Sequence, residues 1–188
     1  MSRKNRRSSQ HSERRRSPIP CTNHLIVAPL WVAFGANLGT LLRSCDAVGA
    51  CMAVPETEHY RRSLEVGDTL PTRPCLHWVD SKLGWIERQQ GQGAQIIGVE
   101  LDEDSIPLRQ VRQATRRSVV LLGHEHSGLP AEVWPFLDLV VEIPMMGVGL
   151  SLNGGRRLPG LVQACRPILR WRRDKGLTAG PVYGQRTG

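Results

Sequence analysis

The chain has 188 residues, which is enough for one domain with a substantial hydrophobic core and short tails. Its apolar stretches are short and interrupted by Gly, Pro or charge, and no apolar core follows the charged N-terminus, so we expect neither a membrane-spanning helix nor a secretory signal. The formal net charge of +8 arises from the two ends, because seven of the 25 Lys and Arg lie in residues 1–16 and eight follow Asn153, whereas only Glu13 and Asp174 of the 17 acids lie there.

Residues 1–22 are rich in Arg and Ser and poor in apolar residues, so they bury too little surface to offset the entropy cost of ordering. We therefore predict a disordered basic tail. Basic tails attract phosphate whatever the sequence, which favours nucleic acid as a partner. The alternative is that Arg-rich ends only keep the chain in solution, and composition alone does not separate the two interpretations.

Five cysteines are scattered along the chain, and no two of them form a Cys-x-x-Cys pair. They are Cys21, Cys45, Cys51, Cys75 and Cys165. An odd, scattered set is typical of a protein of the reducing cytoplasm. We therefore expect reduced thiols and a cytoplasmic location.

The predicted elements begin with a strand at residues 24–28, followed by a Gly-bearing loop that leads to a helix over residues 38–48. Apolar residues in that helix recur three and four positions apart, which predicts one buried face: Leu38, Leu41, Leu42, Cys45 and Val48. Gly49 ends the helix, and residues 51–54 form a second short strand before Pro55.

The next part of the chain is more polar. Residues 56–75 contain one weak helical stretch around residues 60–65, then a loop marked by Gly and Pro. A short strand at residues 76–79 leads to Asp80 or Ser81, either of which can cap a helix that runs to about residue 90. Three further elements follow from local patterns: a strand at residues 94–99, an acidic solvated loop at residues 100–104 and a brief helix at residues 108–114.

The stretch from Ser118 to Asn153 organises the fold. It predicts a buried strand at residues 119–122, a tight Gly-bearing loop, a helix opened at Pro130 and Ala131, a second buried strand at residues 139–143 and a loop that ends in Ser-Leu-Asn. Strands and helices alternate, so the fold class is α/β with a mostly parallel sheet and flanking helices. Parallel strands finish at one edge of the sheet, and open α/β sheets bind ligands there, so we expect the functional site at these loops.

The loop GHEHSG at residues 123–128 argues against several kinds of site by its spacing. His124 and His126 are two positions apart, whereas a helical zinc motif needs four. The Gly-x-Ser-x-Gly spacing of a hydrolase elbow is absent, and Leu129 stands where a phosphate-binding loop carries Lys. What remains is exposed backbone beside one carboxylate, Glu125. Backbone with small neighbouring side chains suits an adenine ring and its ribose.

Three motifs in this order resemble those of the SpoU (TrmH-like) ribose methyltransferases of the SPOUT superfamily. NLGTLLRSC at residues 37–45 is similar to their first motif, and GHEHSGL at residues 123–129 to their second. The third is matched by IPM at residues 143–145 together with SLN at residues 151–153. The resemblance covers roughly residues 24–153 and implies a trefoil-knotted methyltransferase domain over residues 23–153. It also implies a homodimer, bound S-adenosylmethionine, and methyl transfer to a ribose 2′-hydroxyl of tRNA or rRNA without a metal.

The resemblance implies that residues at the motif positions have the roles of the corresponding site residues in the family. The implied cofactor contacts are Gly123, Ile143, Leu152, Met145 and, at the end of the preceding strand, Val99. Arg43 takes the position of a cation near the reacting oxygen or a phosphate. The other polar motif positions, which we interpret as orienting groups, are Asn37, Glu125, Ser151 and Asn153.

The resemblance stops after Asn153. The family continues with an apolar helix, whereas GGRRLPG at residues 154–160 opposes a helix and places Arg where packing is expected. We therefore separate residues 154–188 as an atypical basic C-terminal segment. A coding-level hypothesis explains the change, because deletion of two nucleotides after the Asn153 codon converts a typical family sequence into these residues. Resequencing the gene at that codon tests this frameshift.

Two rival interpretations follow. The first is a catalytically silent RNA-binding relative of the same fold, favoured by the altered segment and the basic ends. The second is an unrelated α/β nucleotide-binding protein that shares only loop glycines.

Overall fold

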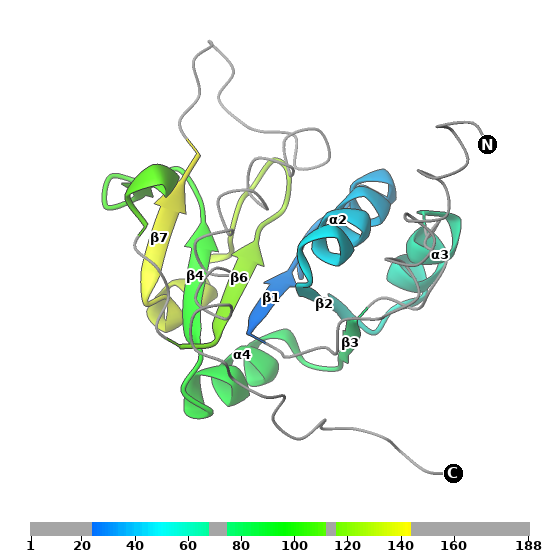
Figure 1. The fold of residues 1–188 in the computed structure, drawn as a ribbon, viewed down its shortest axis with the longest axis horizontal. Coiled ribbons are helices and arrows are strands. Elements are labelled where there is room, and N and C mark those ends of the chain that lie inside the picture. Colours follow the sequence, from blue (N-terminus) through cyan, green and yellow to red (C-terminus); the bar gives the residue numbers. More distant parts are fainter. Residues whose placement is uncertain (1–23, 68–74, 112–115, 144–188) are drawn as a thin grey trace, which may run out of the picture.

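The computed structural model describes residues 24–67, 75–111 and 116–143, which form one parallel β-sheet with helices on both faces (Figure 1). The strands lie in the order β3-β2-β1-β6-β4-β7-β5, and each neighbouring pair runs parallel. Their bounds are β1 Leu25–Ala28, β2 Cys51–Pro55, β3 Leu76–Val79, β4 Gln95–Val99, β5 Ile106–Pro107, β6 Ser118–Leu122 and β7 Leu139–Glu142. The predicted α/β class is therefore confirmed.

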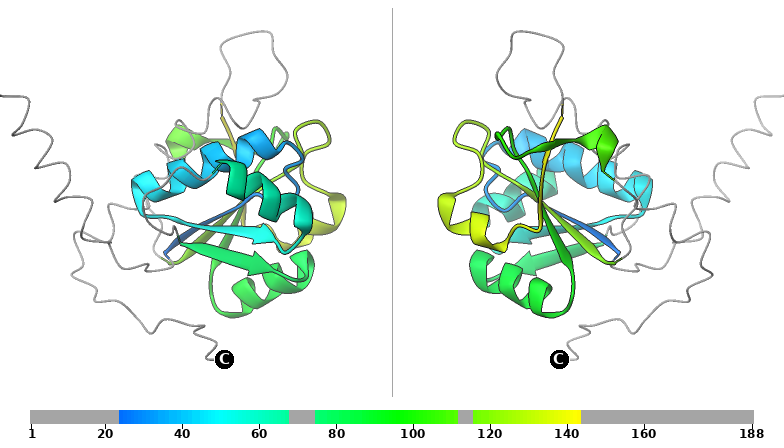
Figure 2. Two further views of the ribbon diagram at one scale, coloured as in Figure 1. Left: turned by 90° about the vertical axis from the view of Figure 1, so that its right-hand side faces the viewer. Right: turned by 90° about the vertical axis from the view of Figure 1, so that its left-hand side faces the viewer.

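Helices cover the two faces of this sheet. The α-helices are α2 Gly35–Val48, α3 Glu58–Gly67 and α4 Lys82–Gly91, and two short 3-10 turns are η1 Leu108–Gln110 and η2 Ala131–Phe136. Figure 2 shows α2 and α3 on one side of the sheet and α4 on the other. None of the described helices has the length and apolar content needed to cross a membrane.

Alternating side chains of the strands build a core on each face. In β1, Leu25 and Val27 pack in the core beneath α2 and α3, whereas Ile26 and Ala28 pack in the core beneath α4 and η2. The residues predicted to form the apolar stripe of α2 lie in the first core, with only Val48 partly exposed. Because both faces are covered, the strands are mostly apolar rather than alternating with polar residues.

Local capping agrees with the sequence prediction at two helix ends. Gly49 ends α2 in the left-handed conformation with φ 72°, a conformation that costs glycine little. Of the two residues predicted to cap α4, Ser81 does so, because its hydroxyl accepts a hydrogen bond from the Gly84 amide over 3.4 Å.

Several predicted boundaries are wrong. Helix α2 already begins at Gly35, so Asn37 lies in its first turn and not in the preceding loop. The helix predicted at Pro130 is only a 3-10 turn, because Pro135 lies inside it and has no amide hydrogen to donate. In the predicted helix at residues 108–114 the structure shows a 3-10 turn over Leu108–Gln110, and residues 112–115 lie outside the described ranges. The two-residue strand β5 beside β7 was not predicted.

The expectation of reduced cysteines is wrong for one pair. Cys51 and Cys75 form a disulfide, although they are 24 residues apart in the sequence. Parallel pairing of β2 with β3 brings them together, since Met52 lies opposite Leu76. A linear spacing rule does not detect neighbours that only the sheet register creates.

Candidate functional site

Four strands end side by side at the carboxyl edge of the sheet. Ala28 of β1 pairs with Leu121 of β6, while Val99 of β4 pairs with both Leu122 of β6 and Val141 of β7. The loops that follow these strands therefore start from one edge, which is where open α/β sheets bind ligands.

Three of the predicted cofactor contacts lie at this edge. Val99 ends β4, Gly123 directly follows β6, and Ile143 directly follows β7, so they sit on three neighbouring strands of the sheet. All three are half-buried. Four other predicted site residues lie outside the described ranges: Met145, Ser151, Leu152 and Asn153.

The loop after β6 is closed by its own backbone. The His124 amide donates to the Gly128 carbonyl over 2.9 Å, and the Gly128 amide donates to the His124 carbonyl over 3.0 Å. Inside this loop the His126 amide donates to His124 Nδ1 over 3.1 Å. Glu125 is therefore carried by a tight loop with a defined backbone.

Close contacts explain both glycines of the loop. A Cβ on Gly123 would lie 2.5 Å from the Leu129 nitrogen. Gly128 has φ 67°, and a Cβ there would lie 2.8 Å from the carboxyl carbon of Glu100. The Glu100 carboxylate in turn accepts a hydrogen bond from the Leu129 amide over 2.9 Å. Half-buried Glu100 thus anchors the loop, which corrects its predicted place in a solvated acidic loop.

The Glu125 carboxylate connects this loop to the start of α2. It accepts hydrogen bonds from the Ala33 amide over 2.9 Å, from the Phe34 amide over 3.2 Å and from Asn37 Nδ2 over 2.7 Å. Phe34 is the residue that precedes α2, so the carboxylate lies at a helix N-terminus, where negative charge is stabilised. The structure therefore brings the first and second motifs together through Asn37 and Glu125.

These contacts set the ionisation of Glu125. Burial raises the pKa of its carboxyl group, but hydrogen bonds from the Ala33 amide, its own amide, Asn37 and the Phe34 amide outweigh burial and hold the pKa below its ordinary value. Glu125 is an anion at neutral pH. A carboxylate with a lowered pKa is a weak proton acceptor, so an anchoring role fits it better than that of a general base.

Helix α3 holds the β1–α2 loop from its other side. The Tyr60 hydroxyl donates to the Val32 carbonyl over 2.7 Å, with the Pro29 carbonyl at 3.2 Å, and His59 Nε2 lies 3.0 Å from the Ala33 carbonyl. Burial, together with the negative charge of Glu125, raises the pKa of Tyr60, so the phenol stays protonated and acts as a donor.

Arg43 lies on the part of α2 that faces α3. Its guanidinium donates to the Gly67 carbonyl over 3.0 Å and to Thr40 Oγ1 over 3.2 Å, and the side chain is exposed. The two helices approach closely at this point, because a Cβ on Gly39 would lie 2.7 Å from the Gly67 Cα. Asn37 and Arg43 therefore have different partners: Asn37 binds the Glu125 loop, whereas Arg43 is oriented by the end of α3.

Four residues that support this site were not predicted as site residues from the sequence: Gly39, Tyr60, Gly67 and Glu100. For Glu100 a signal exists, since it is the first acidic residue after a strand that ends at the ligand edge. Tyr60 and Gly67 lie in a stretch with only weak helical character, and their partners depend on how α3 packs on α2. No local sequence pattern predicts how α3 packs on α2.

Residues 26–155 match the model of the SpoU rRNA Methylase family. A tRNA (guanosine(18)-2′-O)-methyltransferase of Mus musculus is 31% identical over 141 residues, which are 70% of this chain and 8% of that protein. The enzyme of the same name from Aquifex aeolicus is 26% identical over 152 residues, 79% of this chain and 70% of that protein.

Solved structures share the fold. The A. aeolicus TrmH/SpoU tRNA modifying enzyme superimposes with a TM-score of 0.67 at 23% identity, covering 89% of this chain and 85% of that chain. AviRb from Streptomyces viridochromogenes, a SpoU methyltransferase solved in complex with AdoMet, gives a TM-score of 0.58 at 24% identity, covering 84% of this chain and 64% of that chain. The matching segment is a small part of some relatives. It is 8% of the Mus musculus protein and 10% of the tRNA (guanosine(18)-2′-O)-methyltransferase of Saccharomyces cerevisiae.

Proposed function

This chain belongs to the SpoU rRNA methylase family, and we propose that it transfers the methyl group of S-adenosylmethionine to a ribose 2′-hydroxyl of tRNA or rRNA. The observation that carries the proposal is the junction of Glu125 with Asn37 and the start of α2, at the edge of the sheet where three predicted cofactor positions lie. Relatives named tRNA (guanosine(18)-2′-O)-methyltransferase support tRNA as the first substrate to test.

The described part of the edge is chemically suited to S-adenosylmethionine. The cofactor supplies an electrophilic methyl group on a sulfonium. Val99, Gly123 and Ile143 are half-buried and carry no charged side chain, and the main chain of Gly123 and Ile143, which follow their strands, is suited to donate to and accept from a purine. The implied contacts of Met145 and Leu152 stay predictions.

We assign different tasks to the polar residues. Glu125 and Asn37 hold the β1–α2 loop against the loop after β6, so the two sides of the edge keep one relative position. Rigid placement of reacting groups supplies much of the acceleration in a transfer reaction. Arg43, held by Gly67 and Thr40, offers a fixed guanidinium to a phosphate or to the developing alkoxide. Ser151 and Asn153 stay predicted orienting groups.

Several implied properties also belong to this proposal. They are the trefoil knot, the homodimer, the cytoplasmic location and the domain limits at residues 22–23 and 153–154. An analytical ultracentrifugation run over a range of protein concentrations tests the homodimer. A predominantly monomeric protein at all concentrations would contradict it.

The methyl-transfer proposal is tested with purified full-length protein, S-adenosylmethionine labelled in its methyl group, and unmodified tRNA or rRNA transcripts. We expect label in the RNA and one phosphodiester bond that becomes resistant to alkali, because 2′-O-methylation removes the hydroxyl that attacks the phosphate. RNA binding with neither S-adenosylmethionine binding in calorimetry nor methyl transfer would instead identify the catalytically silent relative.

A further inference from the structure

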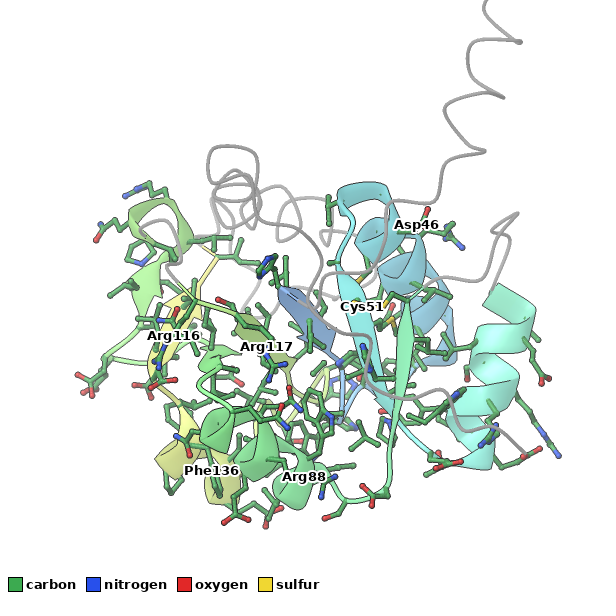
Figure 3. All side chains as sticks on the ribbon, turned by 60° about the horizontal axis from the view of Figure 1, so that its bottom comes forward. Asp46, Cys51, Arg88, Arg116, Arg117 and Phe136 are labelled. Atoms are coloured by element: carbon green, nitrogen blue, oxygen red, sulfur yellow. A yellow bond between two sulfur atoms is a disulfide. The ribbon has the colours of Figure 1, made fainter. Side chains whose placement is uncertain are left out.

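Two cysteines and a histidine gather where β2 and β3 begin, away from the carboxyl edge of the sheet. Cys51 opens β2, Cys75 immediately precedes β3, and His77 is the second residue of β3. Cys75 and His77 are two positions apart, so they point to the same face of the sheet. That face is the one beneath α4, since Cys51 and Cys75 both pack in its core (Figure 3 labels Cys51).

The register of the two strands explains the cluster. Met52 lies opposite Leu76 and Ala53 lies opposite His77, which places Cys51 level with Cys75. Ala53 is small, so the imidazole meets little side-chain bulk on the neighbouring strand. His77 Nε2 lies 3.6 Å from Cys75 Sγ, and one ligand atom from each of the three residues lies within 4.8 Å of the others.

The 3.6 Å between His77 Nε2 and Cys75 Sγ matches the spacing of two neighbouring ligands in a metal site with soft ligands. Zinc binds sulfur at about 2.3 Å and imidazole nitrogen at about 2.0 Å, so neighbouring ligands of a tetrahedral ion lie roughly 3.5–3.8 Å apart. The two sulfur atoms need only separate from the disulfide to reach such a distance. Thiolate and imidazole are also the ligand types that select zinc over magnesium or calcium.

We propose that Cys51, Cys75 and His77, once the disulfide is reduced, bind one Zn²⁺ ion, with water in the fourth position. Reduction by a phosphine breaks the sulfur–sulfur bond, adds two protons to give two thiols, and converts the phosphine to its oxide with oxygen from water. Zinc binding then releases both thiol protons. The proposal concerns a site separate from methyl transfer and holds whether or not the chain is an active methyltransferase.

The position of the cluster suits both burial and access. Cys51 is 1% exposed, so its thiolate lies out of water, whereas Cys75 and His77 are half-buried. Strand β3 is at one end of the described sheet, so the cluster lies at its margin. Bound zinc would join the same two strands that the disulfide joins. In either state the two ends of the segment that contains β2 and α3 are linked.

The test uses full-length protein reduced with a phosphine, freed of metal and kept anaerobic. Titration with Zn²⁺ against a chromophoric chelator is expected to give one ion per chain. Titration with Co²⁺ is expected to give thiolate-to-cobalt charge-transfer absorption and the strong visible bands of a tetrahedral ion. Protein with an intact disulfide is expected to show neither.

Two single variants address the ligands. Cys75→Ser and His77→Ala change half-buried residues, and circular dichroism establishes that each is folded. Loss of an outer-shell partner weakens metal binding roughly 10–100-fold, so loss of a ligand is expected to weaken Zn²⁺ binding by at least about 100-fold. The control is the double variant Cys21→Ser/Cys165→Ser, which changes two cysteines that are not among the proposed ligands and is expected to bind Zn²⁺ like the unchanged protein.

Two outcomes would overturn the proposal. One is a reduced protein that gives no thiolate charge-transfer band with Co²⁺. The other is a folded His77→Ala variant that binds Zn²⁺ with unchanged affinity.

Discussion

The Glu125 carboxylate accepts a 2.7 Å hydrogen bond from the Asn37 side-chain amide, which joins two motifs 88 residues apart in the sequence. Two further hydrogen bonds from the Ala33 and Phe34 amides complete the carboxylate's contacts with the start of α2. The junction thus uses one anion to satisfy three donors, two of them backbone amides next to a helix N-terminus.

Replacement of Glu125 by Gln is expected to lower the free energy of unfolding by about 1–3 kcal/mol. The amide has one oxygen in place of two, so its NH₂ group must face donors that previously met an acceptor. Urea unfolding measures the change, and Glu87→Gln on the exposed side of α4 is the control. Equal effects of the two substitutions would contradict an anchoring role for Glu125.

The stability contributed by Glu125 should depend on pH. The pKa of this carboxyl group is lower in the folded protein than its ordinary value, so the contribution is fully present above the ordinary value and is lost as pH falls through the folded pKa. We therefore expect the difference in unfolding free energy between the unchanged protein and Glu125→Gln to be largest near neutral pH and to shrink below about pH 4. A difference that grows in acid would contradict the assignment.

Replacement of Arg43 by Ala is expected to reduce methyl transfer by about 100-fold or more, because it removes the cation proposed to face the reacting oxygen. The side chain is exposed, so the unfolding free energy should change little. Single-turnover rates with saturating S-adenosylmethionine measure the effect. Arg62→Ala on α3 removes another exposed guanidinium, which pairs with Glu58, and it serves as the control.

Replacement of Gly39 by Ala is expected to destabilise the protein by about 1–3 kcal/mol, because the new methyl group meets the Gly67 backbone and forces α2 and α3 apart. The same movement would carry the Gly67 carbonyl away from Arg43, so methyl transfer should fall as well. Thermal unfolding and transfer rates report the two effects. Gly91→Ala at the end of α4, where nothing lies within 4 Å of the new Cβ, should leave both nearly unchanged.

Some features of this fold can be predicted from the sequence for physical reasons. Short apolar strands that alternate with helices predict a parallel sheet, and the sheet then requires the Glu125 loop and the other strand ends to share one edge. The motif resemblance assigned both Asn37 and Glu125 to the site, whereas the hydrogen bond between them was not predicted. What fixes these features is local pattern plus topology.

Other features depend on contacts between distant segments. The Cys51–Cys75 pair needs the register of β2 on β3, and the Gly39–Gly67 approach needs the packing of two helices. Strand β5 is too short, and contains a proline, to produce a strand pattern of its own. Each of these features is set by a partner elsewhere in the chain.

The β1–α2 loop is held by Glu125 on one side and by α3 on the other, so its backbone groups can serve as internal spectroscopic probes. The backbone amides of Ala33 and Phe34 sense the charge and position of Glu125 directly, while the carbonyls of Val32 and Ala33 sense α3 through Tyr60 and His59. Nuclear magnetic resonance shifts of these two amides would therefore reveal whether a molecule arriving at the sheet edge disturbs the loop after β6, even when it touches neither amide.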